Sequence, residues 1–214
     1  MKQFVAAAVC VFAMGSAQAA TVIYSEDFES YSVPSGNFIS FNAPGTFGGW
    51  TVGGGGVDLT SATYGGIWPA SGSASLDLNG SEAGSITRTL GGLTVNGQYS
   101  LTFDYAANQD GLGVMVGVSR PFDAGVGATS ASFSSGSFVG FTSGQLLFSA
   151  TSTSMNLVFQ SSIGGPRGAI LDNIQVAAVP EPHEWAMMVA GLGLVGWAAR
   201  RRRDGQDNAR MVVS

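Results

Sequence analysis

The sequence predicts an all-β protein, an antiparallel sandwich of two sheets. Short runs in which apolar and polar residues alternate are separated by clusters of Gly, Ser, Asn and Pro, and no periodic repeat is visible. The alternation is clearest at 99–105, where Tyr99, Leu101, Phe103 and Tyr105 alternate with polar residues. Roughly ten short strands at this spacing are typical of a two-sheet sandwich.

The predicted strands follow one another along the chain with turn residues between them. The glycines at 53–56 separate the first two strands as a loose connection, because a phosphate-binding loop would need a following lysine and helix. In 112–118, Leu112, Val114, Val116 and Val118 alternate with glycine and methionine. The predicted strands are 50–52, 57–59, 74–78, 85–90, 99–105, 112–118, 137–141, 145–150, 155–159 and 170–176.

The first 19 residues have the pattern of a secretory signal peptide. Lys2 precedes an apolar run, and an Ala-x-Ala ending predicts cleavage by signal peptidase after Ala19. Cleavage would remove Cys10, the one cysteine of the chain. We therefore expect an exported domain, 20–178, without disulfides and without a thiol nucleophile.

The predicted domain is acidic. Residues 20–179 hold three arginines, no lysine and ten acidic residues, a net charge of −7. Such a charge disfavours binding to nucleic acid, and it repels anionic lipids and polysaccharides. We expect neutral glycans or divalent cations as its partners.

The region 179–203 joins a rigid acidic motif, an apolar segment and a basic block. The segment 185–199 is uncharged over 15 residues and is predicted to be a transmembrane helix, although its length is marginal against the ~20 residues of a usual span. The positive-inside rule places the arginines and the tail 204–214 in the cytoplasm, and the domain outside. The motif is Pro180, Glu181 and Pro182, and the basic block that stops the anchor is Arg200, Arg201, Arg202 and Arg203.

This arrangement resembles the PEP-CTERM sorting signal of Gram-negative bacteria. The resemblance implies that a membrane-embedded exosortase cuts the exported precursor near the Pro-Glu-Pro motif. We therefore expect a precursor anchored in the inner membrane and a mature protein at the cell surface or in the extracellular matrix.

The domain also carries short segments that resemble another family. Gly49-Trp50-Thr51-Val52, the segment 72–80, the strand 99–104 and Leu171-Asp172-Asn173-Ile174 are similar to the choice-of-anchor C domains and related galactose-binding-like jelly rolls. The resemblance implies a jelly-roll order of strands. In those folds the first and last strands lie close together and often hold a structural calcium ion.

Calcium is the cofactor that the carboxylates suggest. Asp172 shares strand parity with Ile170 and Ile174, which predicts a side chain on the core side that needs a partner. Together with Asp27 and Glu29 near the N-terminus, Asp172 would supply the hard oxygen ligands that Ca²⁺ prefers. The alternative is that Asp172 caps backbone amides, or a turn through Asn173.

A carbohydrate site is predicted near a loop with two large aromatic residues. Tyr64 and Trp68 lie among glycines and a proline, where a ring is free to stack on a sugar. Trp50 begins a predicted strand, and we expect it in the core. The polar residues expected to orient sugar hydroxyls are Asn79, Asp104 and Asn108.

Catalysis can be judged from the residues available. His183 is the one histidine and lies in the sorting region, so Ser-His and Cys-His chemistry are excluded from the domain. Asp58, Asp77 and Asp104 have outward parity and could converge on one sheet face as a glycosidase pair. Since solvated strand aspartates are common, we expect no enzyme, and a role in binding polysaccharide or in matrix structure. The alternatives are a secreted glycan hydrolase with paired carboxylates and an inert coat protein.

Overall fold

The computed structural model describes residues 20–62, 64, 69–108, 119–136, 140–180 and 189–201. These residues belong to two units: residues 20–179 form one, and Pro180 and the segment 189–201 belong to the other. The predicted signal peptide 1–19, the predicted strand 112–118, Trp68, Glu181, Pro182, Arg202 and Arg203 lie outside the described residues.

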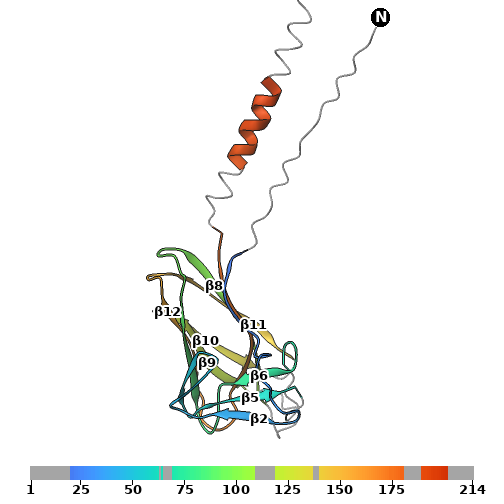
Figure 1. The fold of residues 1–214 in the computed structure, drawn as a ribbon, viewed down its shortest axis with the longest axis vertical. Coiled ribbons are helices and arrows are strands. Elements are labelled where there is room, and N and C mark those ends of the chain that lie inside the picture. The colour runs from blue at the N-terminus through green and yellow to red at the C-terminus, as the bar shows by residue number, and fades with distance from the viewer. Residues whose placement is uncertain are drawn as a thin grey trace, which may run out of the picture. The chain divides into compact units, whose positions relative to one another are not determined.

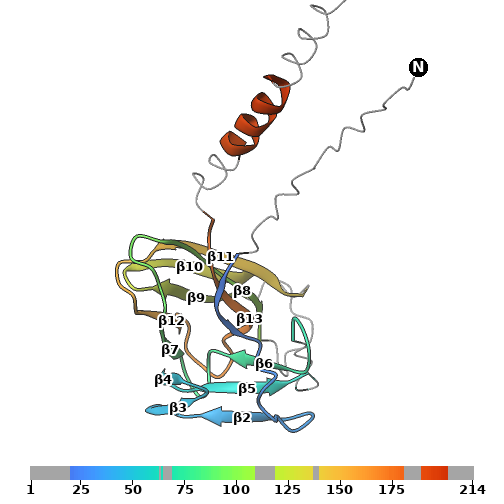
Figure 2. The same cartoon turned by 45° about the horizontal axis from the view of Figure 1, so that its top comes forward.

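Residues 20–179 fold into two antiparallel sheets packed face to face (Figures 1 and 2). The larger, seven-stranded sheet A contains β1 (Val22–Glu26), β2 (Phe38–Phe41), β5 (Val57–Ser61), β6 (Ala74–Asp77), β8 (Gln98–Ala107), β11 (Thr142–Ser149) and β13 (Ala169–Ala178). The six-stranded sheet B contains β3 (Gly45–Phe47), β4 (Trp50–Gly54), β7 (Gly84–Leu90), β9 (Ser119–Val126), β10 (Thr129–Gly136) and β12 (Met155–Ser161). The predicted all-β sandwich is therefore confirmed.

The last eight strands pass back and forth between the two sheets. They are ordered β6-β13-β8-β11 in sheet A and β7-β12-β9-β10 in sheet B. This order is consistent with a jelly roll, in which two Greek keys are wound into a double sheet. The earlier strands β2 and β5 extend sheet A beyond β6, and β3 and β4 extend sheet B beyond β7.

Most predicted strands are confirmed where the structure describes them. Regular apolar alternation explains this agreement, since in β12 the side chains alternate between buried and more exposed along the whole strand. The prediction of a strand at 137–141 is wrong for Gly140 and Phe141, because β10 ends at Gly136 and β11 begins at Thr142.

The prediction missed five strands: β1, β2, β3, β9 and β10. In β2 three of the four residues are apolar and they lie on both faces, which hides the period of two. β9 contains Pro121, which usually demotes a run to a non-strand, and β10 is rich in small serines. Their pairing partners in sheet B, rather than local preference, make these segments strands.

Aromatic side chains fill the space between the sheets. Phe103 of sheet A lies with its ring centroid 5.1 Å from Phe159 and 5.9 Å from Phe122, both on sheet B. Trp50 is fully buried, as predicted, and packs edge-on against Tyr24 at 5.9 Å. Gly144 lies beside Phe103, where an added Cβ would fall 2.5 Å from a ring atom, so only glycine fits.

β13 is the central strand of sheet A. It pairs with β8 along one side, and on the other side first with β6 and then with β1. Between these two partners the register shifts, at Asp172 to Gln175, and Asn173 adopts a left-handed φ of 49°. β13 therefore has a bulge at the point where its partner changes.

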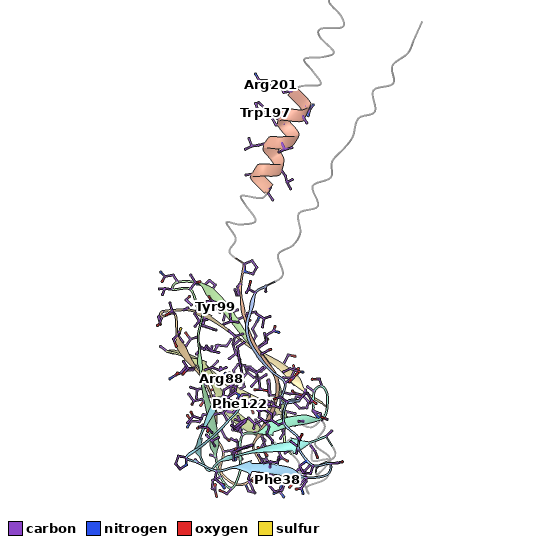
Figure 3. The ribbon with its side chains drawn as sticks, in the orientation of Figure 1. Phe38, Arg88, Tyr99, Phe122, Trp197 and Arg201 are labelled. Carbon is purple, nitrogen blue, oxygen red and sulfur yellow. The ribbon has the colours of Figure 1, made fainter. Side chains whose placement is uncertain are left out.

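The second unit contributes a single described helix, residues 189–201, whose side chains are exposed. It runs two residues further than the predicted 185–199, and the guanidinium of Arg201 lies 5.2 Å from the ring centroid of Trp197 (Figure 3). Among the described residues, no helix has both the length and the apolar character needed to cross a bilayer.

Candidate functional site

A cavity of about 390 Å³ opens on the outer face of sheet A, over β2, β5 and β6. Phe38, which lines it, lies at the opposite end of the sandwich from Tyr99 in Figure 3. The strands supply Phe38, Ser40, Asp58, Thr60 and Asp77 to its wall. The connecting segments supply Asn42, Tyr64, Gly80, Ser81, Asn108, Pro166 and Arg167.

Strand register places the lining residues on one face. Ser40 is directly opposite Asp58, and Asp58 is directly opposite Asp77 across the next strand pair. Phe38 is likewise opposite Thr60. Because residues opposite each other in antiparallel strands project to the same side, these side chains form one polar surface that includes a single aromatic ring, Phe38.

Asp77 is the most deeply buried carboxyl of the site, with 1% of its surface exposed. Its Oδ1 accepts hydrogen bonds from the amides of Asn79 (2.8 Å) and Gly168 (2.9 Å), and its Oδ2 accepts one from Asn108 Nδ2. Burial raises the pKa of Asp77 to about 7, although these three donors act in the opposite direction. The side chain therefore changes its charge near neutral pH.

Asp58 is less buried than Asp77 and has fewer partners. Burial raises its pKa, while a hydrogen bond from the Ser40 side chain lowers it. Its Oδ1 is buried and has no hydrogen-bond partner among the described residues. A buried acceptor without a donor is costly when it is charged, which agrees with the raised pKa of this carboxyl.

Phe38 and Tyr64 form the aromatic part of the cavity. Their ring centroids are 5.0 Å apart at an interplanar angle of 53°. Phe38 is 38% exposed, although it is a large apolar side chain. An exposed aromatic beside polar groups is a suitable surface for the apolar face of a sugar ring.

Asn79 lies next to the cavity but does not line it. The residue is fully buried, and its Nδ2 donates to the carbonyls of Ile163 (2.8 Å) and Gly165 (2.6 Å). Gly168 faces it so closely that an added Cβ would lie 2.4 Å from Asn79 Oδ1. Asn79 therefore holds the 163–168 segment, and with it Arg167, beside the site.

Of the residues expected to bind a ligand, only Tyr64 and Asn108 line the cavity, and Trp68 lies outside the described residues. Asp104 is on β8, where it accepts hydrogen bonds from Ser143 Oγ (2.6 Å) and Asn173 Nδ2 (2.9 Å). Asp58 and Asp77 do meet, as their outward parity predicted. Asp104 does not join them, because β13 separates β8 from β6.

Sequence reasoning did not single out Phe38, Ser40, Asn42, Thr60 or Arg167. Phe38, Ser40 and Asn42 lie in or just after β2, a strand without visible alternation. Arg167 lies 90 positions beyond Asp77 in the chain, and only the fold brings them together. The available signal was the rarity of arginine, since the domain has three.

The carboxylates expected to bind calcium accept hydrogen bonds from backbone amides. Glu29 accepts hydrogen bonds from the amides of Ser73 (2.7 Å) and Ala74 (2.9 Å), and these bonds lower its pKa despite the opposing effect of burial. Asp172 accepts one from the amide of Ser71 (3.1 Å), and Asp27 accepts one from the amide of Glu29 (3.2 Å). Within the described residues, no group of three or more His, Cys, Asp or Glu side chains is arranged to hold a metal.

The predicted core-side orientation of Asp172 is wrong, although the residue is fully buried. Asp172 is directly opposite Asp104, on the outer face of sheet A, whereas Ile174 and Val176 belong to the core. The bulge after Asp172 reverses the parity on which the prediction depended. The bonds that Asp172 accepts from Ser71 and from the amide of Asn173 (2.7 Å) match the capping alternative.

Comparison with known proteins identifies two regions of the chain. Residues 21–177 match the family described as "Protein of unknown function (DUF642)", and residues 178–203 match the PEP-CTERM protein-sorting motif. Halomucin of Haloquadratum walsbyi is 29% identical over 177 residues, which cover 80% of this chain. The match spans only 2% of the length of halomucin.

Similar solved structures include several carbohydrate-binding modules. TmCBM61, solved with β-1,4-galactotriose, has a TM-score of 0.46 and 14% identity, and covers 62% of this chain and 90% of its own. The CBM22 tandem domain of Xyn10C from Paenibacillus barcinonensis has a TM-score of 0.48 and 17% identity, with coverages of 78% and 49%. A family 35 module from Clostridium thermocellum has a TM-score of 0.41 and 16% identity, with coverages of 65% and 97%.

The raised pKa of Asp77 predicts that stability falls as pH rises toward neutrality. Its carboxyl loses its proton near 3.8 in the unfolded chain but near 7 in the folded protein, so between these values the folded state binds more protons. The free energy of unfolding should therefore decrease from pH 5 to pH 7.5 in urea titrations. In Asp77→Asn this decrease should be smaller and confined mainly to the region below pH 6.5, where Asp172, with a pKa of about 6, still titrates.

Asp104→Asn is the matched control for that experiment, because Asp104 lies on the same sheet face outside the cavity. In this variant the free energy of unfolding should still decrease between pH 6.5 and pH 7.5, where Asp77 titrates. An Asp77→Asn profile as steep as that of the wild type would contradict the assignment of the titration to Asp77.

Calcium binding stays a prediction, since backbone carbonyls and water can complete a shell around few carboxylates. An ion that binds only the folded state adds about 2.7 kcal/mol at a hundredfold excess over its Kd. EDTA should then lower the melting temperature, and added Ca²⁺ should restore it. Two results together would contradict calcium binding: EDTA leaves the melting temperature unchanged, and Glu29→Gln lowers the stability. The role of these carboxylates would then be to accept hydrogen bonds from residues 71–74.

Proposed function

The chain belongs to the DUF642 family and carries a PEP-CTERM sorting motif, and we propose that it is an exported protein whose β-sandwich binds extracellular polysaccharide in the cavity over β2, β5 and β6. The sorting motif implies export. We propose further that an exosortase processes an inner-membrane precursor of a Gram-negative bacterium, and that the mature protein resides at the cell surface or in the extracellular matrix.

The observation that carries the binding proposal is the combination of Phe38 and Tyr64 with hydrogen-bonding groups in one cavity. Sugars present hydroxyls at their edges and C–H groups on their faces, so both kinds of surface are needed to bind them. Asp58, Thr60 and Asn108 provide acceptors and donors at the cavity wall. Few charged side chains take part, which suits a ligand that is not anionic.

The paired carboxylates also make hydrolysis a candidate. Glycosidases place their two carboxyl groups on either side of the scissile bond, about 5 to 9.5 Å apart. Asp58 and Asp77 project from one sheet face at directly opposite positions, and Asp77 accepts hydrogen bonds from three donors. This arrangement favours binding, and the absence of new reducing ends from a bound polysaccharide would separate binding from hydrolysis.

The aromatic pair predicts a loss of binding without a loss of stability. Phe38→Ala and Tyr64→Ala should each weaken binding to polysaccharides captured on a glycan array by about tenfold, or about 1.4 kcal/mol. Leu147→Ala is the control, since Leu147 is 60% exposed on β11 of the same sheet, away from the cavity. If Phe38→Ala and Tyr64→Ala bind as tightly as Leu147→Ala, the cavity is not the ligand site.

If the sorting motif is altered, we expect the uncut precursor to stay in the membrane. Replacement of Pro180, Glu181 and Pro182 by alanine should leave uncut protein in the membrane fraction, whereas the wild type should appear outside the cell without Arg200 to Ser214. Alanine at Asp204, Gln206 and Asp207, beyond the matched motif, should change nothing. Mass spectrometry of the extracellular protein decides the question, and a mature form that keeps its arginines would contradict exosortase processing.

A further inference from the structure

Among the described residues that line the cavity, acidic side chains outnumber basic ones. Asp58 and Asp77 are the acidic residues among those that line it, and Arg167 is the basic one. The donors that bind Asp77 are two backbone amides and the Asn108 amide, none of which has a charge. In a domain of net charge −7, the surrounding field also favours a ligand with positive charge.

Two carboxyl groups lie side by side on neighbouring strands of the cavity wall. Asp58 and Asp77 occupy directly opposite positions on β5 and β6, an arrangement that is unfavourable when both are ionised. The buried Oδ1 of Asp58 has no hydrogen-bond partner among the described residues. A cationic N–H donor from a ligand at the Asp58 carboxyl group would reduce the repulsion between the two carboxylates.

The aromatic side of the cavity also suits a cationic group of a ligand. Phe38 and Tyr64 present rings 5.0 Å apart next to the acidic positions. An ammonium group is attracted to the face of an aromatic ring, and the C–H face of a sugar packs against it. A ligand with both features would use both halves of the cavity.

We infer that the cavity prefers a sugar unit with a free amino group, as in glucosamine polymers, over its neutral and N-acetylated counterparts. The ammonium donates to Asp58, and the sugar ring packs on Phe38 and Tyr64. This inference depends on the proposed function, because it names the class of carbohydrate bound in the same cavity.

Matched oligosaccharides test the inference. The purified full chain is titrated calorimetrically at pH 6.5 and low salt with β-1,4-linked tetramers of glucosamine, N-acetylglucosamine and glucose. The glucosamine tetramer should bind at least tenfold more tightly than the other two, and its advantage should shrink as salt is raised, because the charge is partly screened. Asp58→Asn should bring the three affinities within about threefold of one another, whereas the control Asp104→Asn should keep the wild-type ratio.

Each result separates the inference from the proposed function. Equal or tighter binding of glucose or N-acetylglucosamine overturns the preference for an amino sugar and leaves carbohydrate binding intact. Binding of glucosamine alone that survives both Asp58→Asn and Phe38→Ala is charge attraction outside the cavity and also overturns the inference. If no tetramer binds, and no polysaccharide on the array binds, both the inference and the proposed function are wrong.

Discussion

The change of partner along β13 is the constraint on which the rest of sheet A depends. One side of this strand is shared by β6 and β1, and the bulge at Asp172 to Gln175 separates the two pairings. The segment 71–74 is held near this change of partner by hydrogen bonds. Its amides donate to Asp172 at one end and to Glu29 at the other. β6 continues from this segment, so the carboxylates that fix it also fix β6, its neighbour β5 and the cavity that both strands line.

The outer face of sheet A has an unusual distribution of polarity. Sandwich strands usually bury one face and solvate the other, yet Asp77 and Asp172 are buried on the outer side, under connecting segments. Backbone amides supply most of their hydrogen bonds, which offset much of the free energy that burial of the carboxyls costs. A domain with three arginines and no lysine has few other means to bury a carboxyl. The raised pKa values of both groups follow from this arrangement.

The sequence predicted the strands that have a clear period and missed those that depend on their neighbours. β8 and β12 alternate regularly and were predicted. β2 gave no local signal because apolar residues lie on both of its faces, and β9 gave none because it contains Pro121. Parity correctly predicted that Asp58 and Asp77 share a face, but it failed for Asp172, since one bulge reverses every side chain beyond it. The cavity could not be predicted as a whole, because Phe38, Asp77 and Arg167 come together only through strand order.

The cavity and the end of the domain that leads to the sorting motif lie at separate places. Val179, the residue before Pro180, donates its amide to the carbonyl of Gln98, and Ala178 pairs with Tyr99. Tyr99 and the cavity residue Phe38 lie at opposite ends of the sandwich (Figure 3). No residue that lines the cavity belongs to the strand ends from which the chain leaves for the motif. The proposed binding cavity and the strand ends next to the sorting motif therefore consist of different residues, and a substitution in one can be interpreted without assuming a change in the other.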